Sequence, residues 1–231
     1  MTVSDMSVHK RTAAREAADM VKSGMVVGLG TGSTAAYMIE RLGERIAEGL
    51  EIFGIPTSDD SEDKAIKAGI PLTDFSAHRR IDIAIDGADE VQRGSLNLIK
   101  GLGGALLREK IVAQAAKRFV VIVDGTKPVD LLGERATVPV EVISFGWECT
   151  AERLAACGAR GVKPRADRAG SLFVTDTGNM ILDCHFGPIE NPEDLAEKID
   201  RIVGVVEHGM FLNMASDVLV ATTEGVERWE P

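Results

Sequence analysis

A glycine-rich turn between an apolar run and a helical pattern is the feature that most restricts how this chain can fold. Residues 28–34 read Gly-Leu-Gly-Thr-Gly-Ser-Thr, after the apolar run Met25–Val27 and before an amphipathic helix predicted over 33–48. Such a turn joins a strand to a helix and leaves backbone N–H groups open at the positive end of the helix dipole. It predicts an anion site, most often for phosphate, or else a tight turn that binds nothing. Ser33 and Thr34 add hydroxyl donors, and one of them is expected to cap the helix.

Two better-known phosphate motifs do not match this turn. A P-loop needs a lysine directly after its last glycine, and no lysine follows Gly32. A dinucleotide fingerprint needs a third glycine where this chain has Ser33, and an acidic residue about 20 positions later at the end of a second strand. A small phosphorylated ligand therefore fits better than a nicotinamide cofactor.

The charge balance restricts the partners. The chain has 231 residues, of which 45% are hydrophobic, and a formal net charge of −10. Nucleic acids and anionic membranes attract basic surfaces, so neither is expected as a partner. An acidic protein that binds phosphate must gather a few lysines or arginines beside its glycine-rich loops.

Cysteine and histidine usage predicts a reduced protein without a metal. Three cysteines are widely spaced and form no CxxC pair, and the four histidines show no HExxH spacing. The sequence begins with no signal-peptide pattern, and no apolar run reaches the ~18 residues of a membrane span. We expect a cytoplasmic protein with no metal and no cofactor.

Strand and helix patterns alternate along the first half of the chain. Strands are expected at 25–29, 51–55, 81–85 and 119–123, and helices at 9–22, 33–48, 61–68 and 104–117. This alternation predicts an α/β fold with a Rossmann-like parallel sheet.

The pattern then changes to that of a small α+β unit. A strand is expected at 138–143, a helix at 147–157, a hairpin of 172–174 with 180–184, and a helix from Asn191 to about Ile202. This order is close to a ferredoxin-like unit. We predict a Rossmann-like domain of residues 1–131 plus 208–231, with residues 132–207 inserted as a smaller α+β domain.

Acidic side chains follow the third expected strand, in the run Asp86-Gly87-Ala88-Asp89-Glu90. Ligands of parallel sheets collect at the carboxyl ends of strands, which makes Asp86 and Asp89 candidates for substrate contact. The alternative is that Asp and Gly merely shape the turn.

Glu109 is the candidate general base. Its neighbours three and four positions away on the expected helix are all apolar, namely Ala105, Leu106, Val112 and Ala113. Burial among such groups would raise the pKa of the carboxyl toward the range of a general base. The alternative is an ion pair with a neighbouring segment.

Two lysines lie in further loops of this kind. Lys100 opens the second glycine-rich segment, Lys100-Gly101-Leu102-Gly103, and Lys127 follows the strand expected at 119–123. Lys127 is either an ordinary surface lysine or a phosphate ligand. Together the loops offer phosphate donors, carboxylates, lysines and one helical glutamate, an inventory that suits proton transfer on a small phosphorylated polar substrate.

Five motifs in this order resemble those of ribose-5-phosphate isomerases of the A type, over about residues 10–227. They are Gly30-Thr-Gly-Ser-Thr34, Asp86-Gly-Ala-Asp-Glu90, Lys100-Gly-x-Gly103, Leu107-Arg-Glu-Lys110 and Asp124-x-x-Lys127. The resemblance implies metal-independent interconversion of ribose 5-phosphate and ribulose 5-phosphate through an enediolate, a step of the non-oxidative pentose phosphate pathway.

The resemblance also implies roles for individual residues. Glu109 corresponds to the base that moves the proton between carbons 1 and 2, and Asp86 and Lys100 to groups that open the sugar ring and polarise its oxygens. The substrate-binding residues it implies are Thr31, Gly32, Ser33, Thr34, Asp86, Gly87, Ala88, Asp89, Lys100, Gly101, Leu102, Gly103 and Lys127.

Leu102 departs from the pattern, because many family members have glycine there. A backbone N–H remains available at this position, but a positive φ would strain a leucine.

Other readings remain open. A sugar-phosphate sensor would carry a DNA-binding segment, an amino-sugar phosphate deaminase would be expected to show a catalytic histidine, and a CoA-transferase needs a nucleophilic glutamate in another context. The family implies a homodimer or homotetramer.

Overall fold

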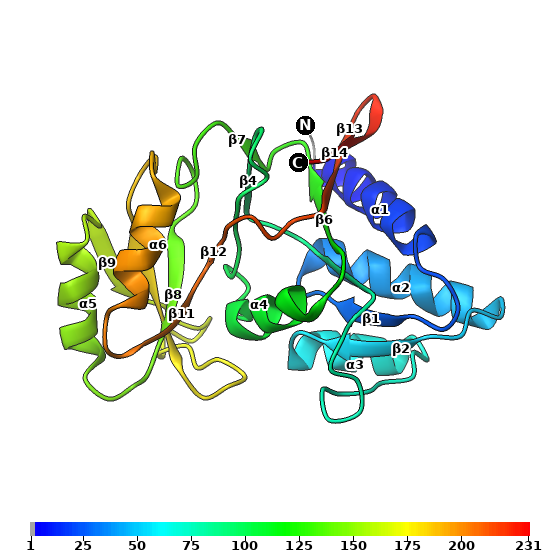
Figure 1. Cartoon of the computed structure of the whole chain (residues 1–231), viewed down its shortest axis with the longest axis horizontal. Coiled ribbons are helices and arrows are strands. Elements are labelled where there is room, and N and C mark those ends of the chain that lie inside the picture. Colours follow the sequence, from blue (N-terminus) through cyan, green and yellow to red (C-terminus); the bar gives the residue numbers. More distant parts are fainter. Residues whose placement is uncertain (1–2) are drawn as a thin grey trace. The chain divides into compact units, whose positions relative to one another are not determined.

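The computed structural model describes residues 3–231, and it divides into two compact units, coloured by sequence in Figure 1. The first comprises residues up to Ala88, Arg108–Lys127 and Met214–Pro231. The second comprises Asp89–Leu107 and Pro128–Asn213. Residues 89–107 thus belong to the second compact unit, whereas the sequence-based boundary places them in the first domain.

A six-stranded sheet forms the centre of the first unit. Its strand order is β14-β13-β6-β3-β1-β2, and all neighbours are parallel except the β13–β14 hairpin. The strands are β1 (Val26–Leu29), β2 (Phe53–Pro56), β3 (Ile83–Asp86), β6 (Phe119–Asp124), β13 (Asp217–Thr222) and β14 (Gly225–Trp229). Every residue of β1, β3 and β6 is buried, as apolar runs in a parallel sheet predict. The α/β class is confirmed.

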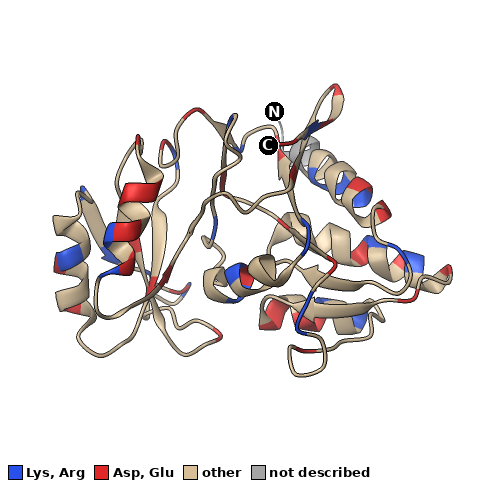
Figure 2. Ribbon diagram, in the orientation of Figure 1, with Lys and Arg blue, Asp and Glu red and all other residues tan. Residues whose placement is uncertain are grey.

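Four helices accompany this sheet: α1 (Val3–Asp19), α2 (Ser33–Ala47), α3 (Asp59–Lys67) and α4 (Leu106–Ala115). Alanines at 13, 14, 17 and 18 are fully buried and join α1 to the core shared with α2 and the sheet. Figure 2 marks acidic and basic residues along α1 and α2, and Arg15 of α1 pairs with Glu44 of α2 at 2.6 Å. Such exposed pairs contribute little to stability, so the apolar face holds these helices.

The second unit contains a four-stranded antiparallel sheet in the order β11-β8-β10-β9. Its strands are β8 (Val138–Val142), β9 (Gly161–Pro164), β10 (Met180–His185) and β11 (Val205–His208). Helices α5 (Trp147–Ala156) and α6 (Pro192–Asp200) contribute Leu154 and Ile199 to a separate core. Helix α6 begins with Asn191 as its N-cap and Pro192 in its first turn, as predicted.

The turn of the predicted hairpin is present, because the N–H of Thr175 donates to the carbonyl of Asn179 at 2.9 Å and Val174 bridges Met180. The predicted pairing does not extend further: β10 lies between β8 and β9, its ladder with β9 runs from Leu182↔Pro164 to His185↔Gly161, and Leu172 bridges Ala166. Strand β9 could not be predicted from the sequence, because none of its residues is fully buried and it lacks the apolar alternation of a half-buried strand.

A third, smaller sheet was not expected from the sequence. It runs β12-β5-β4-β7 and belongs to the second unit. Its strands are β4 (Glu90–Gln92), β5 (Leu98–Ile99), β7 (Pro128–Val129) and β12 (Met210–Phe211). Strands β4 and β5 carry the segments that directly follow Asp89 and directly precede Lys100. Both candidate residues therefore lie at the edges of a hydrogen-bonded framework.

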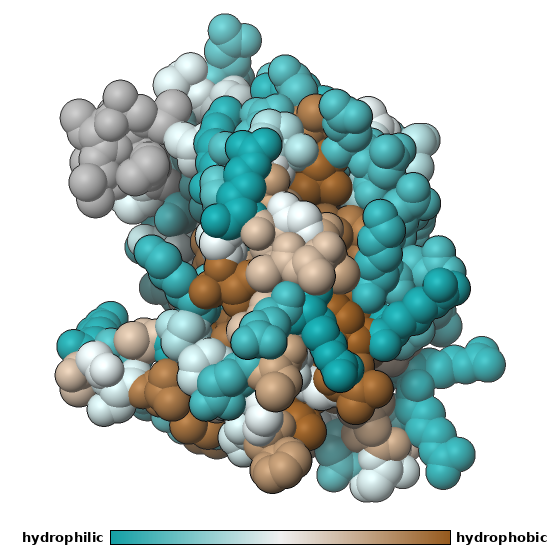
Figure 3. Space-filling model, turned by 90° about the vertical axis from the view of Figure 1, so that its left-hand side faces the viewer, coloured by the Kyte–Doolittle hydropathy of each residue, from teal (hydrophilic) through white to brown (hydrophobic). Residues whose placement is uncertain are grey.

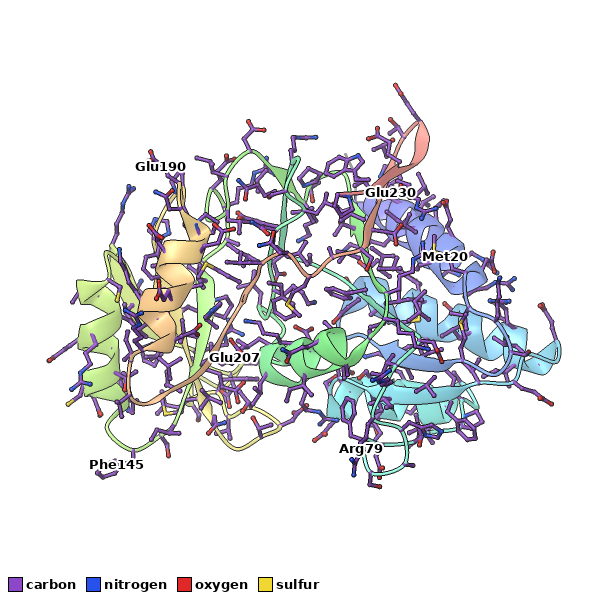
Figure 4. All side chains as sticks on the ribbon, in the orientation of Figure 1. Met20, Arg79, Phe145, Glu190, Glu207 and Glu230 are labelled. Carbon is purple, nitrogen blue, oxygen red and sulfur yellow. The ribbon has the colours of Figure 1, made fainter. Side chains whose placement is uncertain are left out.

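The face that Figure 3 shows is mostly hydrophilic, with apolar side chains between. Phe145 is 90% exposed, and Figure 4 shows its side chain projecting from the loop between β8 and α5. In residues 3–231, every helix falls short of the length and apolarity needed to cross a membrane.

Candidate active site

The side chain of Asp86 holds the backbone of the glycine-rich turn in place. Its Oδ1 accepts the backbone N–H groups of Thr31 (3.0 Å) and Gly87 (2.7 Å), and its side chain is buried. Gly30 permits this arrangement, because a Cβ there would overlap the Asp86 carboxyl group. The N–H of Gly30 donates to Ile85 at 3.0 Å. The first N–H groups of the turn are thus used internally, contrary to the expectation that the turn leaves them open.

Three hydroxyl groups meet at the end of β2. Thr31 Oγ1 lies 2.7 Å from Thr57 Oγ1 and 2.7 Å from Ser58 Oγ, and Thr57 also donates to the carbonyl of Leu29 at 3.0 Å. Ser58 begins α3 with a capping box to Ser61. Thr57 and Ser58 therefore hold the side chain of Thr31 in one orientation. The sequence did not indicate this role for either residue.

Helix α2 begins at Ser33, and its N-cap is Gly32, with φ of 101°. The prediction that Ser33 or Thr34 caps the helix is wrong, because both lie inside its first turn. Thr34 is buried and Ser33 is exposed. The first N–H groups of any helix have no partner within it, so this end of α2 retains the features of an anion site.

Lys10 is a candidate that sequence analysis missed. Its Nζ donates to Ser33 Oγ at 3.0 Å, which places a positive charge from α1 beside the start of α2. A single lysine in an amphipathic helix carries no local signal, because such residues are normally solvated. Only the packing of α1 on α2 shows where this charge lies.

Glu109 is buried, with 5% of its surface exposed, as its apolar helical neighbours predict. It lies beside a void too small to hold a water molecule, together with Gly30, Asp86, Val112 and Ala113. Gly28 lets α4 approach β1, since a Cβ at that position would contact Val112 at 2.5 Å. The first unit thus brings the glutamate, the aspartate and the glycine-rich turn together.

Lys127 lies in a turn after β6. The turn is held by Asp124, whose Oδ1 accepts the N–H of Thr126 at 2.9 Å and whose carbonyl accepts that of Lys127 at 3.1 Å. Lys127 itself is half-buried. Its position at the carboxyl end of a central parallel strand matches the prediction.

The other candidates, Asp89 and Lys100–Gly103, belong to the second unit. Lys100 is 2% exposed, its N–H donates to Gly209 at 2.8 Å, and its ammonium lies 5.6 Å from the centre of the Phe211 ring. Asp89 Oδ2 accepts the N–H of Leu102 at 3.0 Å. The N–H of Leu102 is thus engaged, contrary to the expectation that it stays available.

Leu102 is not strained. Gly101 takes the positive φ of this loop, at +99°, and Leu102 does not have a positive φ. Its side chain is 44% exposed. Leucine therefore replaces glycine here without conformational cost.

A roomier cavity, of about 500 Å³, also belongs to the first unit and shares Val112 with the small void. Its lining is Ile55, Pro56, Glu62, Leu72, Thr73, Asp74, Phe75, Arg108, Ile111 and Val112. Arg108 is engaged by Asp59 at 2.7 Å. None of the predicted site residues lines this cavity, so its size alone does not identify it as the catalytic site.

Within the described part of the chain, one group of three side chains could gather around a metal ion: Asp200, Glu207 and His208. None of them is a predicted site residue. His208 Nδ1 accepts the N–H of Met210 at 3.2 Å, so the proton of a neutral ring is on Nε2, which lies 3.4 Å from Asp200 Oδ1.

The family model for ribose 5-phosphate isomerase A (phosphoriboisomerase A) matches residues 53–225. The chain is 94% identical over 231 residues to a ribose-5-phosphate isomerase A of Gluconobacter oxydans, covering 100% of both chains. It is 53% identical over 227 residues to that of Gloeobacter violaceus, covering 98% of each.

The solved structures that superpose well on this chain belong to the same family. Ribose 5-phosphate isomerase A from Methanocaldococcus jannaschii superposes with a TM-score of 0.93 at 43% identity, covering 97% of this chain and 99% of that one. A D-ribose-5-phosphate isomerase in complex with phospho-erythronic acid superposes with a TM-score of 0.94 at 41% identity, covering 100% of both chains.

Proposed function

Since this chain belongs to the ribose-5-phosphate isomerase A family, we propose that it interconverts D-ribose 5-phosphate and D-ribulose 5-phosphate by metal-independent proton transfer through an enediolate. The observation that carries the mechanism is that the buried Glu109 lies beside Asp86 and Gly30 around one small void of the first unit. A carboxylate among aliphatic groups is suited to take a proton from carbon.

Glu109 is proposed as the base. It removes the proton from carbon 2 of the open-chain aldose, which leaves an enediolate with its negative charge on oxygen 1. The hydroxyl proton passes from oxygen 2 to oxygen 1, and Glu109 returns a proton to carbon 1, which gives the ketose. A relative was solved with phospho-erythronic acid, which carries a phosphate and a planar carboxylate. An enediolate of a sugar phosphate also has a phosphate and a planar pair of oxygens, and this likeness supports the mechanism.

The phosphate is proposed to lie at the start of α2, near Thr31, Gly32, Ser33 and Thr34. Lys10 adds positive charge there, through its contact with Ser33. Lys127 is proposed as a further substrate ligand. Gly87, Ala88 and Asp89, together with Lys100–Gly103, are proposed to contact the sugar.

Ring opening is proposed for Asp86 and Lys100. Two backbone N–H groups donate to Oδ1 of Asp86 and fix its carboxylate. The carboxylate can still accept a proton from a sugar hydroxyl, because these two bonds do not use all of its lone pairs. Lys100 is a buried cation, and burial strengthens its effect on a nearby oxygen.

The finer architecture is also a proposal. The parallel order β6-β3-β1-β2 supports a Rossmann-like domain, and the antiparallel order β11-β8-β10-β9 supports a ferredoxin-like one, because its strands stand in the order fourth, first, third, second. We propose residues 132–207 as the inserted domain and a homodimer or homotetramer as the assembly.

The test is isomerisation in D₂O. Incubation with ribose 5-phosphate should yield ribulose 5-phosphate with deuterium at carbon 1, because a carboxylic acid exchanges its proton with solvent before returning it. A hydride shift would carry the hydrogen across without exchange. Complete absence of deuterium at full conversion contradicts the enediolate, and loss of turnover in EDTA with recovery on adding a divalent ion contradicts metal independence.

A further inference from the structure

We propose that Arg165 is a positioning residue for the reaction: its guanidinium, held by Asp183, fixes the backbone carbonyls of Gly101 and Leu102 and so the shape of the loop Lys100–Gly103. The inference rests on the proposed function, which assigns substrate binding to this loop. All the residues involved belong to the second unit.

The guanidinium of Arg165 bonds to three residues at once. Nη1 donates to the carbonyl oxygens of Gly101 (2.8 Å) and Leu102 (3.0 Å). Nε donates to Asp183 Oδ2 at 3.0 Å, and Nη2 donates to Asp183 Oδ1. Only 12% of the arginine side chain is exposed. This is a bidentate arginine–carboxylate pair with one arm directed at the loop.

The backbone of Arg165 is held as firmly as its side chain. Its N–H donates to Ile181 of β10 at 2.8 Å, and its carbonyl accepts the N–H of Phe173 at 2.9 Å. Asp183 lies in the same strand β10, paired with Lys163 of β9. The clamp therefore stands on the antiparallel sheet rather than on a free loop.

The loop needs such a clamp because its own sequence is permissive. Gly101 and Gly104 both have positive φ, at +99° and +93°, and Leu102 and Gly103 are exposed. Glycines lose more conformational entropy than other residues on ordering, and a loop that orders only on binding weakens affinity. Arg165 fixes the carbonyls, while Asp89 fixes the N–H of Leu102 at 3.0 Å.

Phe173 completes the support. Its ring occupies the place where a Cβ of Gly104 would lie, and its centre is 6.0 Å from the Arg165 guanidinium carbon. One arginine thus contacts the carboxylate, the aromatic ring and the loop. A lysine cannot make the same set of bonds, because one ammonium group lacks the planar guanidinium that reaches both the two oxygens of Asp183 and the two loop carbonyls.

The experiment compares KM for ribose 5-phosphate in R165A, R165K and R168A. Arg168 is exposed on the same segment and is the matched control. KM does not depend on the fraction of folded enzyme, so a purely structural role would lower the yield or the melting temperature but leave KM unchanged. We expect R165A to raise KM by about tenfold or more, R165K by less, and R168A by less than about twofold.

Values of KM within about twofold of the parent in both Arg165 variants would overturn the inference. Should R165A not fold, D183N takes its place, because it keeps the arginine but removes the charge that orients it. D183N should raise KM by about threefold or more, and an unchanged KM again overturns the inference.

K100A separates this inference from the proposed function. If K100A impairs turnover while the Arg165 and Asp183 variants behave like the parent, only the positioning role fails. If K100A itself has no effect on KM or kcat, the assignment of the loop to substrate binding fails, and the role of Arg165 fails with it.

Discussion

Glu109 and Asp86 are two buried carboxylates with different surroundings. Asp86 accepts the N–H groups of Thr31 and Gly87, which fix its orientation. Glu109 lies on α4 among Val112 and Ala113. The fixed carboxylate suits positioning of hydroxyl groups, and the one in the apolar setting suits removal of a proton from carbon.

Replacing Glu109 with glutamine should lower kcat by about 10²–10⁴-fold, the usual effect of losing a general base. The fold should survive, because the shape is preserved and a buried charge is removed. Steady-state kinetics on ribose 5-phosphate measures the change. The control is E62Q, in the lining of the roomier cavity, which should keep the parent kcat. A parent-like kcat for E109Q would show that Glu109 is structural.

Replacing Lys127 with alanine should mainly raise KM for ribose 5-phosphate, because phosphate contacts supply binding while the proton moves elsewhere. K10A should act in the same direction, given the contact of Lys10 with Ser33. Unphosphorylated ribose should be a very poor substrate. K22A, an exposed lysine, is the control. Similar kcat/KM values for ribose and its phosphate would remove the phosphate site from the proposal.

Strand β13 is tied to its neighbours by one buried carboxylate. Asp217 accepts from Arg118, next to β6, and from Arg228 of β14, each at 2.7 Å, and its side chain is 4% exposed. Burial by itself pushes the pKa of Asp217 upward, but the hydrogen bonds from the two arginines outweigh it and hold that pKa below its ordinary value. The C-terminal strands are therefore stabilised by an ionised group.

This arrangement makes part of the stability depend on pH. Because the folded pKa of Asp217 is lowered, its contribution is complete above the unfolded value of about 3.9 and is lost as the pH falls through the folded value. D217N should cost about 1–3 kcal/mol at neutral pH, since both arginines are partly exposed.

Urea unfolding at neutral pH and below about pH 4 measures this difference, which should shrink on acidification. D19N is the control: Asp19 forms an exposed pair with Arg41, and its loss should cost less than about 1 kcal/mol. A difference between parent and D217N that is the same at every pH contradicts the assignment.

Strand β10 carries a thiol that reports on unfolding of its sheet. Burial raises the pKa of Cys184 to about 12, whereas Cys149 at the start of α5 is exposed. Thiolate is the reactive form, so iodoacetamide near pH 8 should modify Cys149 first and leave Cys184 unmodified until the sheet opens. Peptide mass spectrometry follows both sites in one sample. Equal labelling rates in the native protein would contradict the burial of Cys184.

Substitution of an exposed apolar side chain in the second unit tests the proposed homodimer or homotetramer. Phe145 is 90% exposed and Val203 is 81% exposed, and their two loops are joined by the bond from Ile143 N–H to the carbonyl of Gly204 at 3.0 Å. Side chains of this kind favour association when they lie together. We expect F145D to reduce the average mass in light scattering and to leave the melting temperature of the dissociated chain unchanged.

The control for F145D is I66E, at an exposed apolar position on α3 of the first unit, which should leave the mass unchanged. The same mass for F145D and the parent, with the parent larger than one chain, would show that association uses another surface. A parent that is monomeric at all concentrations would contradict the proposed oligomer.

Local patterns were enough to predict the features that depend on neighbours in sequence. The alternation of strands and helices, the turn before α2, the N-terminal residues of α6 and the burial of Glu109 all follow from periodicity or from turn chemistry within a few positions. These features could be predicted because the apolar face of a helix or strand is buried in any compact fold, whichever segments cover it.

Partners distant in sequence could not be predicted in this way. The N–H of Thr31 is taken by Asp86 and that of Leu102 by Asp89, β9 forms the ladder along β10 beyond the bridge of Val174 with Met180, and Lys10 reaches Ser33. Each of these contacts joins segments that periodicity treats separately. A hydrogen bond is specific to a distance and a direction, and both are set only when the sheets and helices have packed.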